Sequence, residues 1–272
     1  MAVTIGSNVA SLQAQRRLNA TAEQLGGTYA KLSSGLRITK AADDAAGLAV
    51  ADSLRANTRM SAVAIRNAND GISFLSIADG ALNEVGNILT RMSELATQAN
   101  NGTFSTSQKG ALHDEYSQLA QEIDRITKVT TFNSNPIICG TGTSYVLQVG
   151  IDNSSNSQIT INSVDASASG LAVNTLSLSG SAGAAITAIN SAIGSLAARR
   201  GSLGAVESRL RSTVSSLGVQ RENFAAAESR IRDVDVAAES AELTRLNILQ
   251  QAGASVLAQA NQAPALALSL LR

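Results

Sequence analysis

Apolar positions in the first half of the chain recur at alternating spacings of four and three residues. Such a pattern, kept up over about five heptads, is typical of a helix that packs along a coiled-coil seam. It predicts a helix from near Asp44 to Asn100, roughly 85 Å long at 1.5 Å per residue. The seam positions are Ala64, Ala68, Gly71, Leu75, Ala78, Leu82, Val85, Leu89, Met92, Ala96 and Ala99.

Two further segments carry the same helical periodicity. The first follows Ser105 and Gln108, which are spaced as a capping box, so a second helix is expected to begin there. The second runs from Ile186 to Phe224, and Val206 and Val219 are expected to help fill its contact. Their stripes are Leu112, Tyr116, Leu119, Ile123 and Ile126, and then Ile186, Ile189, Ile193, Leu196, Arg200, Leu203, Glu207, Leu210, Val214, Leu217, Arg221 and Phe224.

The pattern changes between Thr130 and about Gly183. The stretches "SYVLQVG" and "SQITINS" alternate between apolar and polar residues, and the turn-rich "IDNSSNS" separates them. Alternation around a turn is the signature of a β-hairpin. The sequence therefore predicts a mainly α fold, a long coiled-coil helical bundle with a small β-hairpin region.

Both ends of the chain also read as amphipathic helices. The last 26 residues carry a single charge, Arg272, so some partner surface is expected to cover them. In this segment the periodicity assigns Leu249, Gly253, Val256 and Ala260 to one stripe, and Gln250, Gln251, Gln259, Asn261 and Gln262 to the opposite face. The seam of the first 36 residues comprises Ile5, Val9, Leu12, Leu18, Ala22, Leu25, Tyr29, Leu32 and Leu36.

Composition narrows the function classes. Acids and bases balance at 21 each, so no broad field attracts nucleic acid or anionic lipid. Aromatic residues make up only 3% of the chain, which leaves few rings to stack on bases. No run of about 20 apolar residues suggests a membrane span, and the first residues lack the pattern of a secretory signal. By these rules alone the protein would be assigned to the cytoplasm.

Candidate chemistry is sparse. His113 and Cys139 are the only residues of their types, which argues against a catalytic triad, a disulfide within the chain and a Cys-rich zinc site. We expect His113 at the rim of a helix and Cys139 packed beside isoleucines. Asp44 and Asp235 each precede a helical pattern, where capping is the commonest role of a carboxylate. The sequence predicts no enzyme, cofactor or metal site.

Several long stretches resemble bacterial flagellins. "LSSGLRITKAADDAAGLAVADSLRA", "NANDGISFLSIADGALNEVGNIL", "RMSELATQANNGT" and "EIDRITKVTTFN" are similar to the N-terminal conserved region of that family. "LGAVESRLRSTVSSL", "ENFAAAESRIRDVDVAAESAELTRLNILQQAGASVLAQANQ" and "ALSLLR" are similar to its C-terminal region. The resemblance covers residues 1–138 and 186–272 and leaves no room for large outer variable domains.

The resemblance implies a self-polymerising subunit of the extracellular flagellar filament, which serves motility. It implies that the chain ends pair as an inner coiled coil from residues 1–42 and 230–272, and that residues 43–229 form a helical bundle with the insert at about 130–183. It also implies type III export of the unfolded chain without a cleaved signal, and contacts with an export chaperone, the filament cap and hook-junction proteins. The expected filament-core assembly residues are Ile5, Val9, Leu12, Leu18, Leu25, Leu32, Leu246, Leu249, Val256, Leu257, Leu266 and Leu270.

The family also includes flagellins that an innate host Toll-like receptor senses. The matching positions here are Arg91, Leu95 and Glu115, although Arg91 and Glu115 can equally form an ion pair within the subunit. Two other functions remain open from the sequence. One is a hook–filament junction protein, and the other is a secreted coiled-coil effector that stays dispersed where a flagellin would polymerise.

Overall fold

The computed structural model of the protein describes residues 7–140 and 142–270, of which residues 263–270 are described by their backbone alone. The chain forms two compact units. One combines residues 1–56 with 223–272, and the other comprises residues 57–222. Both divisions fall inside long helices.

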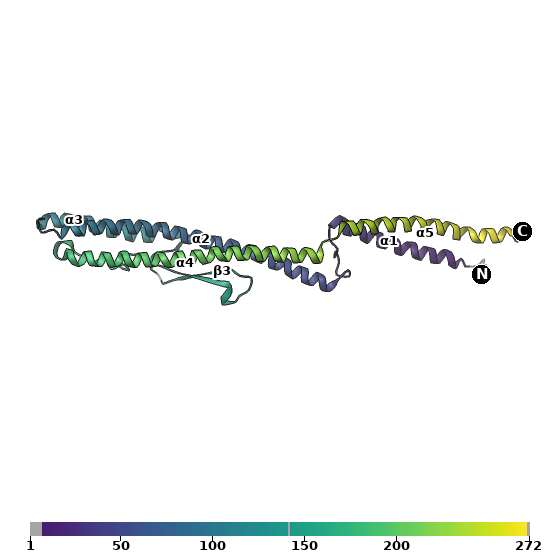
Figure 1. Cartoon of the computed structure of the whole chain (residues 1–272), viewed down its shortest axis with the longest axis horizontal. Helices are drawn as coiled ribbons and strands as arrows, with labels where there is room; N and C mark the ends of the chain where they lie inside the picture. Colours follow the sequence, from purple (N-terminus) through teal and green to yellow (C-terminus); the bar gives the residue numbers. More distant parts are fainter. Residues whose placement is uncertain (1–6, 141, 271–272) are drawn as a thin grey trace. The chain divides into compact units, whose positions relative to one another are not determined.

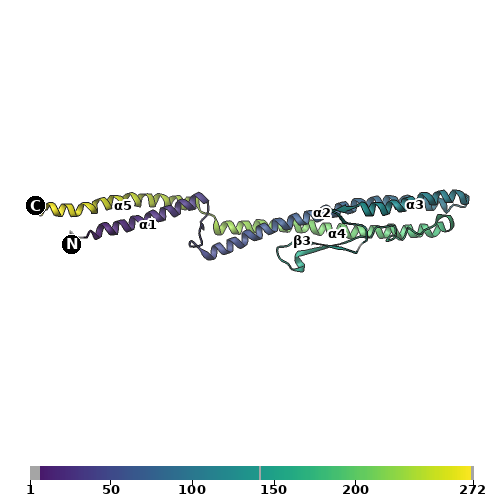
Figure 2. The same cartoon turned by 180° about the vertical axis from the view of Figure 1, so that it is seen from behind.

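The first unit is built around two terminal helices, α1 (Val9–Ser34) and α5 (Val236–Leu270). The two helices lie side by side in both views (Figures 1 and 2). They run antiparallel, because Asn8 at the start of α1 contacts Ala260 near the end of α5, while Leu18 contacts Gly253. The α1 helix ends at Gly35, whose φ of 71° is left-handed and open to glycine at little cost.

An isolated antiparallel β-bridge follows α1 within the same unit. The Arg37 amide donates to the Arg232 carbonyl at 2.6 Å, and the Val234 amide donates to the Gly35 carbonyl at 3.0 Å. Leu36 and Asp233 pair between these two bonds. The bridge gives partners to the carbonyls of Gly35 and Arg232, each of which lies at the C-terminal end of a helix and would otherwise lack one.

The second unit is a bundle of long helices. It contains most of α2 (Ala45–Ala99) and α4 (Leu178–Arg232), together with α3 (Thr106–Val129). The α4 helix has a kink at Ser181, near the end of the predicted insert. Figure 1 shows α3 folded back alongside α2, with α4 running along the same bundle.

The predicted α2 seam is confirmed along its whole length. Each of its positions from Ala64 to Ala99 is buried. On α4 the seam is buried once in every heptad, and Val206 is partly buried against the core. Val219 is 57% exposed, so the prediction that it fills the contact is wrong. The buried α4 seam residues are Ile189, Leu196, Leu203, Leu210 and Leu217.

The β structure is confined to two small antiparallel pairs. The predicted hairpin forms from β3 (Ser144–Gln148) and β4 (Gln158–Asn162), with the 3-10 turn η1 (Ser155–Ser157) between them. The hairpin packs so closely on α2 that a Cβ on Gly71 would collide with the side chain of Leu147. A shorter pair, β1 (Thr131–Phe132) and β2 (Asn135–Pro136), turns through two residues with positive φ.

Helix starts agree with the predicted caps. Ser105 and Gln108 form the reciprocal capping box at the start of α3. The Asp44 carboxylate accepts from the Gly47 amide at 2.8 Å, and the Asp235 carboxylate accepts from the Ala237 amide at 3.0 Å. These carboxylates therefore serve the helix starts of α2 and α5, as their positions predicted.

Among the described residues one helix, α4, is long enough and apolar enough to cross a membrane, judged by length and composition only. Its most apolar 18-residue stretch has a mean hydropathy of 1.2. Its apolar side chains have another role in this fold. Leu178, Ile189 and Leu196 are buried in the core of the helical bundle.

Candidate assembly interface

The α1–α5 pair is held by one heptad stripe from each helix. Small residues let the two helices approach closely, because a Cβ added to Gly253 would already lie 3.4 Å from Leu18 Cδ1. Leu25 and Leu246 are the apolar residues that this pairing buries most fully, at 8% and 1% exposed. The two stripes consist of buried and half-buried residues, which are Ser11, Ala14, Leu18, Thr21, Leu25, Thr28 and Leu32 on α1, and Leu246, Gln250, Gly253, Leu257 and Ala260 on α5.

Polar contacts fix the register near the start of α1. The Asn8 side chain caps α1 by accepting from the Ser11 amide at 3.0 Å, and it donates to the Ala260 carbonyl at 2.7 Å. The Ser11 hydroxyl donates to the Asn261 side-chain oxygen at 2.7 Å. A sliding movement of the helices would break these bonds, so they select one alignment of the two stripes.

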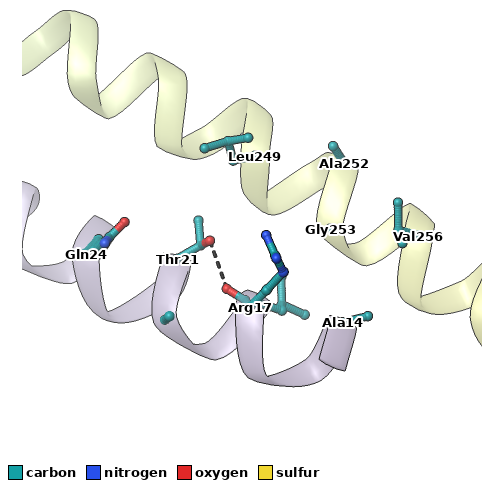
Figure 3. A pocket seen from close by; sticks show the side chains of 10 residues that line it. Ala14, Arg17, Thr21, Gln24, Leu249, Ala252, Gly253 and Val256 are labelled. Atoms are coloured by element: carbon teal, nitrogen blue, oxygen red, sulfur yellow. Dashed lines mark hydrogen bonds between the residues drawn. The ribbon is translucent and has the colours of Figure 1, made fainter. Parts of the chain in front are cut away.

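A groove of about 420 Å³ opens between the two helices. Figure 3 shows Leu249 and Val256 on its α5 side, and Arg17 extending from α1 toward α5. The Arg17 carbonyl accepts from the Thr21 hydroxyl at 3.0 Å, as Figure 3 also shows. The groove is lined by Ala14, Arg17, Leu18, Ala20, Thr21, Gln24, Leu249, Ala252, Gly253 and Val256.

A second apolar stripe lies outside the paired faces and stays exposed in the single subunit. It includes Val9 and Leu12 on α1, which are 54% and 57% exposed. On α5 it includes Ile248, Leu249 and Val256, of which Val256 is 59% exposed. Several large apolar side chains left exposed on one pair of helices are a candidate site of protein association.

The predicted assembly residues therefore divide into two groups. Leu18, Leu25, Leu32, Leu246 and Leu257 are buried or half-buried, at positions that belong to the stripes joining α1 to α5. Val9, Leu12, Leu249 and Val256 are exposed on the outer apolar stripe. Ile5 lies outside the described residues, as do the side chains of Leu266 and Leu270.

The prediction of which residues share a face of the tail helix is wrong at Gln250. The periodicity assigned it to the polar face opposite Leu249, whereas the structure places it half-buried on the stripe that includes Leu246 and Gly253. Leu249 itself points to the groove and remains 44% exposed. Apolar residues on more than one face of α5 made two stripes possible, and contact with α1 selected between them.

The candidate chemical residues form no catalytic constellation in the part of the chain that the structure describes. His113 is half-exposed on α3 and stacks on Tyr116 with ring centroids 6.3 Å apart. Cys139 is half-buried and pairs through its backbone with Asp165. Among the described residues no group of three or more His, Cys, Asp or Glu could hold a metal ion.

The residues that match the receptor-contact positions lie in the second unit. The Arg91 guanidinium donates to Glu115 at 2.8 Å and to Glu94 at 3.0 Å. These hydrogen bonds, above all the one that Glu115 accepts, raise the pKa of Arg91. This is the ion pair within the subunit that the sequence left open. Leu95 is only 1% exposed and packs in the helical core, so a contact with it requires the core to open.

An α-helical fold with paired chain ends and an uncovered apolar stripe defines a class, the coiled-coil structural proteins that associate through their helices. Comparison with known protein families identifies which family within this class the chain belongs to. Residues 5–143 match the bacterial flagellin N-terminal helical region, and residues 186–271 match the bacterial flagellin C-terminal helical region. The chain belongs to the bacterial flagellin family.

Individual relatives agree with this assignment. A flagellin of Halalkalibacterium halodurans is 43% identical over 270 residues, which cover 98% of this chain and 99% of the relative. Flagellin B of Vibrio cholerae is 42% identical over 152 residues, and that match spans only 40% of the longer relative. The crystal structure of Bacillus cereus flagellin is 34% identical with a TM-score of 0.50, and the match covers 60% of this chain and 94% of that one.

The region between the two family matches is small. It holds the β3–β4 hairpin from residue 144 to 162, a loop, and the first residues of α4 up to residue 185. This agrees with the prediction of a minimal flagellin without large outer variable domains.

Proposed function

We propose that the protein is the structural subunit of a flagellar filament and that copies associate through the outer apolar stripe of α1 and α5. The observation that carries the proposal is this stripe, which stays exposed after α1 and α5 have paired. Its burial against neighbouring copies would contribute about 25 cal/mol per Å² of apolar surface. The filament is extracellular and serves motility, and the subunit acts without catalysis.

The low charge of this surface supports the same proposal. Between Asn247 and the end of the described side chains α5 carries no charged residue, and the first three turns of α1 carry only Arg16 and Arg17. An uncompensated charge buried between copies would be repeated at every subunit of a homopolymer, at a cost of several kcal/mol each time. Contacts between different faces of identical copies give an open helical assembly when the rotation between neighbours does not close into a ring.

Several finer roles follow from the resemblance to flagellins and remain part of the proposal. They are export of the unfolded chain through the flagellar type III channel without a cleaved signal, addition at the distal tip, and contacts with an export chaperone, the filament cap and hook-junction proteins. Recognition by a host Toll-like receptor through the exposed Arg91 and Glu115 is a further role, and the buried Leu95 is left out of the proposed contact. Receptor signalling by an Arg91→Ala monomer tests this recognition, and an unchanged response would exclude Arg91 from the proposed receptor contact.

The filament proposal is tested by salting out the purified monomer, sedimenting it and imaging the pellet by electron microscopy. The expected result is long uniform tubes with a narrow lumen. Leu12→Asp puts a charge on the outer stripe and should leave the protein in the supernatant, whereas Leu12→Met keeps the apolar surface and should still assemble. A wild-type protein that stays monomeric even with filament seeds would favour the junction protein or the dispersed effector.

A further inference from the structure

The turn between α2 and α3 contains the only Asn–Gly pair in the sequence, Asn101–Gly102. Both residues are exposed. The turn around them is ordered by backbone bonds, since the Asn101 amide donates to the Gln98 carbonyl at 3.1 Å and the Phe104 amide donates to the Asn101 carbonyl at 3.4 Å. A Cβ placed on Gly102 would meet no atom within 4 Å. The Gly102 nitrogen is therefore open to solvent on the side where a side chain would shield it.

The Asn101 side chain is held in the same turn. Its Oδ1 accepts a hydrogen bond from the Thr103 amide at 3.1 Å. This bond polarises the side-chain carbonyl and donates to the oxygen that gains negative charge when a nucleophile adds to Cγ. The nucleophile is the neighbouring Gly102 nitrogen, whose attack is intramolecular and so avoids the entropy cost of an encounter.

We propose that Asn101 is a site of spontaneous deamidation. A solvent base removes the Gly102 amide proton, and the nitrogen forms a bond to Asn101 Cγ. The bond from Cγ to Nδ2 breaks, and ammonia leaves with a proton from solvent, which produces a succinimide ring. Water then opens either carbonyl of the ring and gives aspartate or isoaspartate. One water is consumed and one ammonia released, with no oxidant or reductant.

No other asparagine in the sequence is followed by glycine, and three examples show further features that slow the reaction. Asn67 lies inside α2 and donates its side-chain amide to the Gln148 carbonyl at 3.0 Å. Asn87 also lies inside α2, where the next backbone nitrogen belongs to the helical ladder and cannot turn toward Cγ. Asn133 lies in a turn but precedes Ser134, whose side chain hinders attack by its nitrogen. Only Asn101 combines exposure with a following glycine.

The product would add a carboxylate at an unfavourable place. Residue 101 follows the C-terminal end of α2, where the helix dipole is negative, and the last turn of α2 carries no basic residue. Asn101 also lines a groove of about 580 Å³ together with Glu94 and Ile193. Isoaspartate would in addition lengthen the backbone and remove the acceptor of the Thr103 amide. In a homopolymer each copy carries this site, so an aged filament would accumulate negative charge.

The test uses the full-length monomer, so it does not depend on assembly. Wild type and Gly102→Ala are incubated at neutral and at mildly alkaline pH, and peptide mass spectrometry with isoaspartate detection maps the products. We expect Asn101 to convert first and faster at alkaline pH, because the nitrogen must lose its proton. Gly102→Ala should slow the conversion by about tenfold or more, since its methyl group shields the nucleophile and stiffens the backbone.

Alanine fits at this position, because Gly102 has open space and no left-handed φ, and circular dichroism of the variant checks its fold. The proposal is overturned if Asn101 keeps its amide while Asn133 or another asparagine converts. It is also overturned if a folded Gly102→Ala converts residue 101 as fast as the wild type.

Discussion

Val256→Ala tests whether the outer apolar stripe drives assembly. Val256 is 59% exposed in the single subunit, so most of its surface remains to be covered by a neighbour. Removing two methyl groups lowers the gain from full burial by about 1.6 kcal/mol, at about 0.8 kcal/mol for each group. The exposed share of that value is about 0.9 kcal/mol per subunit, which corresponds to a rise of about fivefold in the critical concentration for polymerisation.

The critical concentration is measured by sedimenting filaments at a series of total concentrations and determining the monomer left in solution. Val129→Ala is the matched control, because Val129 is 65% exposed but lies at the end of α3 in the other unit. It should leave the critical concentration unchanged. Equal critical concentrations for Val256→Ala and wild type would refute the assignment of the interface, and so would an equal rise for both variants.

Three further predictions concern the helical bundle. Tyr116→Phe should lower the free energy of unfolding, measured in urea, by about 1–3 kcal/mol, because the buried Tyr116 hydroxyl donates to the Val173 carbonyl at 2.8 Å. Tyr29→Phe, at an exposed position, is the control and should change this free energy by less than about 0.5 kcal/mol. Burial raises the pKa of Tyr116 to about 12. The folded state favours the neutral phenol, so its contribution to the free energy of unfolding is complete below the unfolded pKa of about 10 and is lost as pH rises toward 12. Measurements of stability against pH in the alkaline range should show that loss in wild type and not in Tyr116→Phe. Asp79→Asn breaks the pair with Arg200, whose Nε–Oδ1 distance is 2.8 Å, and should cost at most about 1 kcal/mol at these half-exposed positions, with a smaller difference from wild type at high salt.

Prediction from the sequence succeeded where one helix face is apolar and the others are polar. The α2 seam from Ala64 to Ala99 is buried at each predicted position because a single stripe of small and aliphatic residues leaves only one face to bury. The caps at Ser105 and Asp235 were equally readable, because capping depends on a side chain and a backbone amide only a few residues away. The hairpin followed from alternation on both sides of a turn.

The tail helix shows where this reasoning stopped. Its apolar residues lie on more than one face, so periodicity alone could not decide which stripe meets α1. The prediction placed Leu249 inward and Gln250 outward, and the structure has Gln250 half-buried and Leu249 at an open groove. Leu95 is a second case, because only the packing of α2 in the bundle shows that this side chain is 1% exposed.

The sequence by itself determined the helices, their caps, the hairpin and the family, because these depend on local spacing and on stretches of residues that are near in the chain. Only the tertiary structure decided which α5 stripe meets α1. That choice depends on the close approach of Leu18 to Gly253 and on the hydrogen bond from Asn8 to Ala260, which joins residues 252 positions apart. The stripe that remains exposed became visible only after this pairing was known, since exposure is what is left when the contacts of the fold have been made.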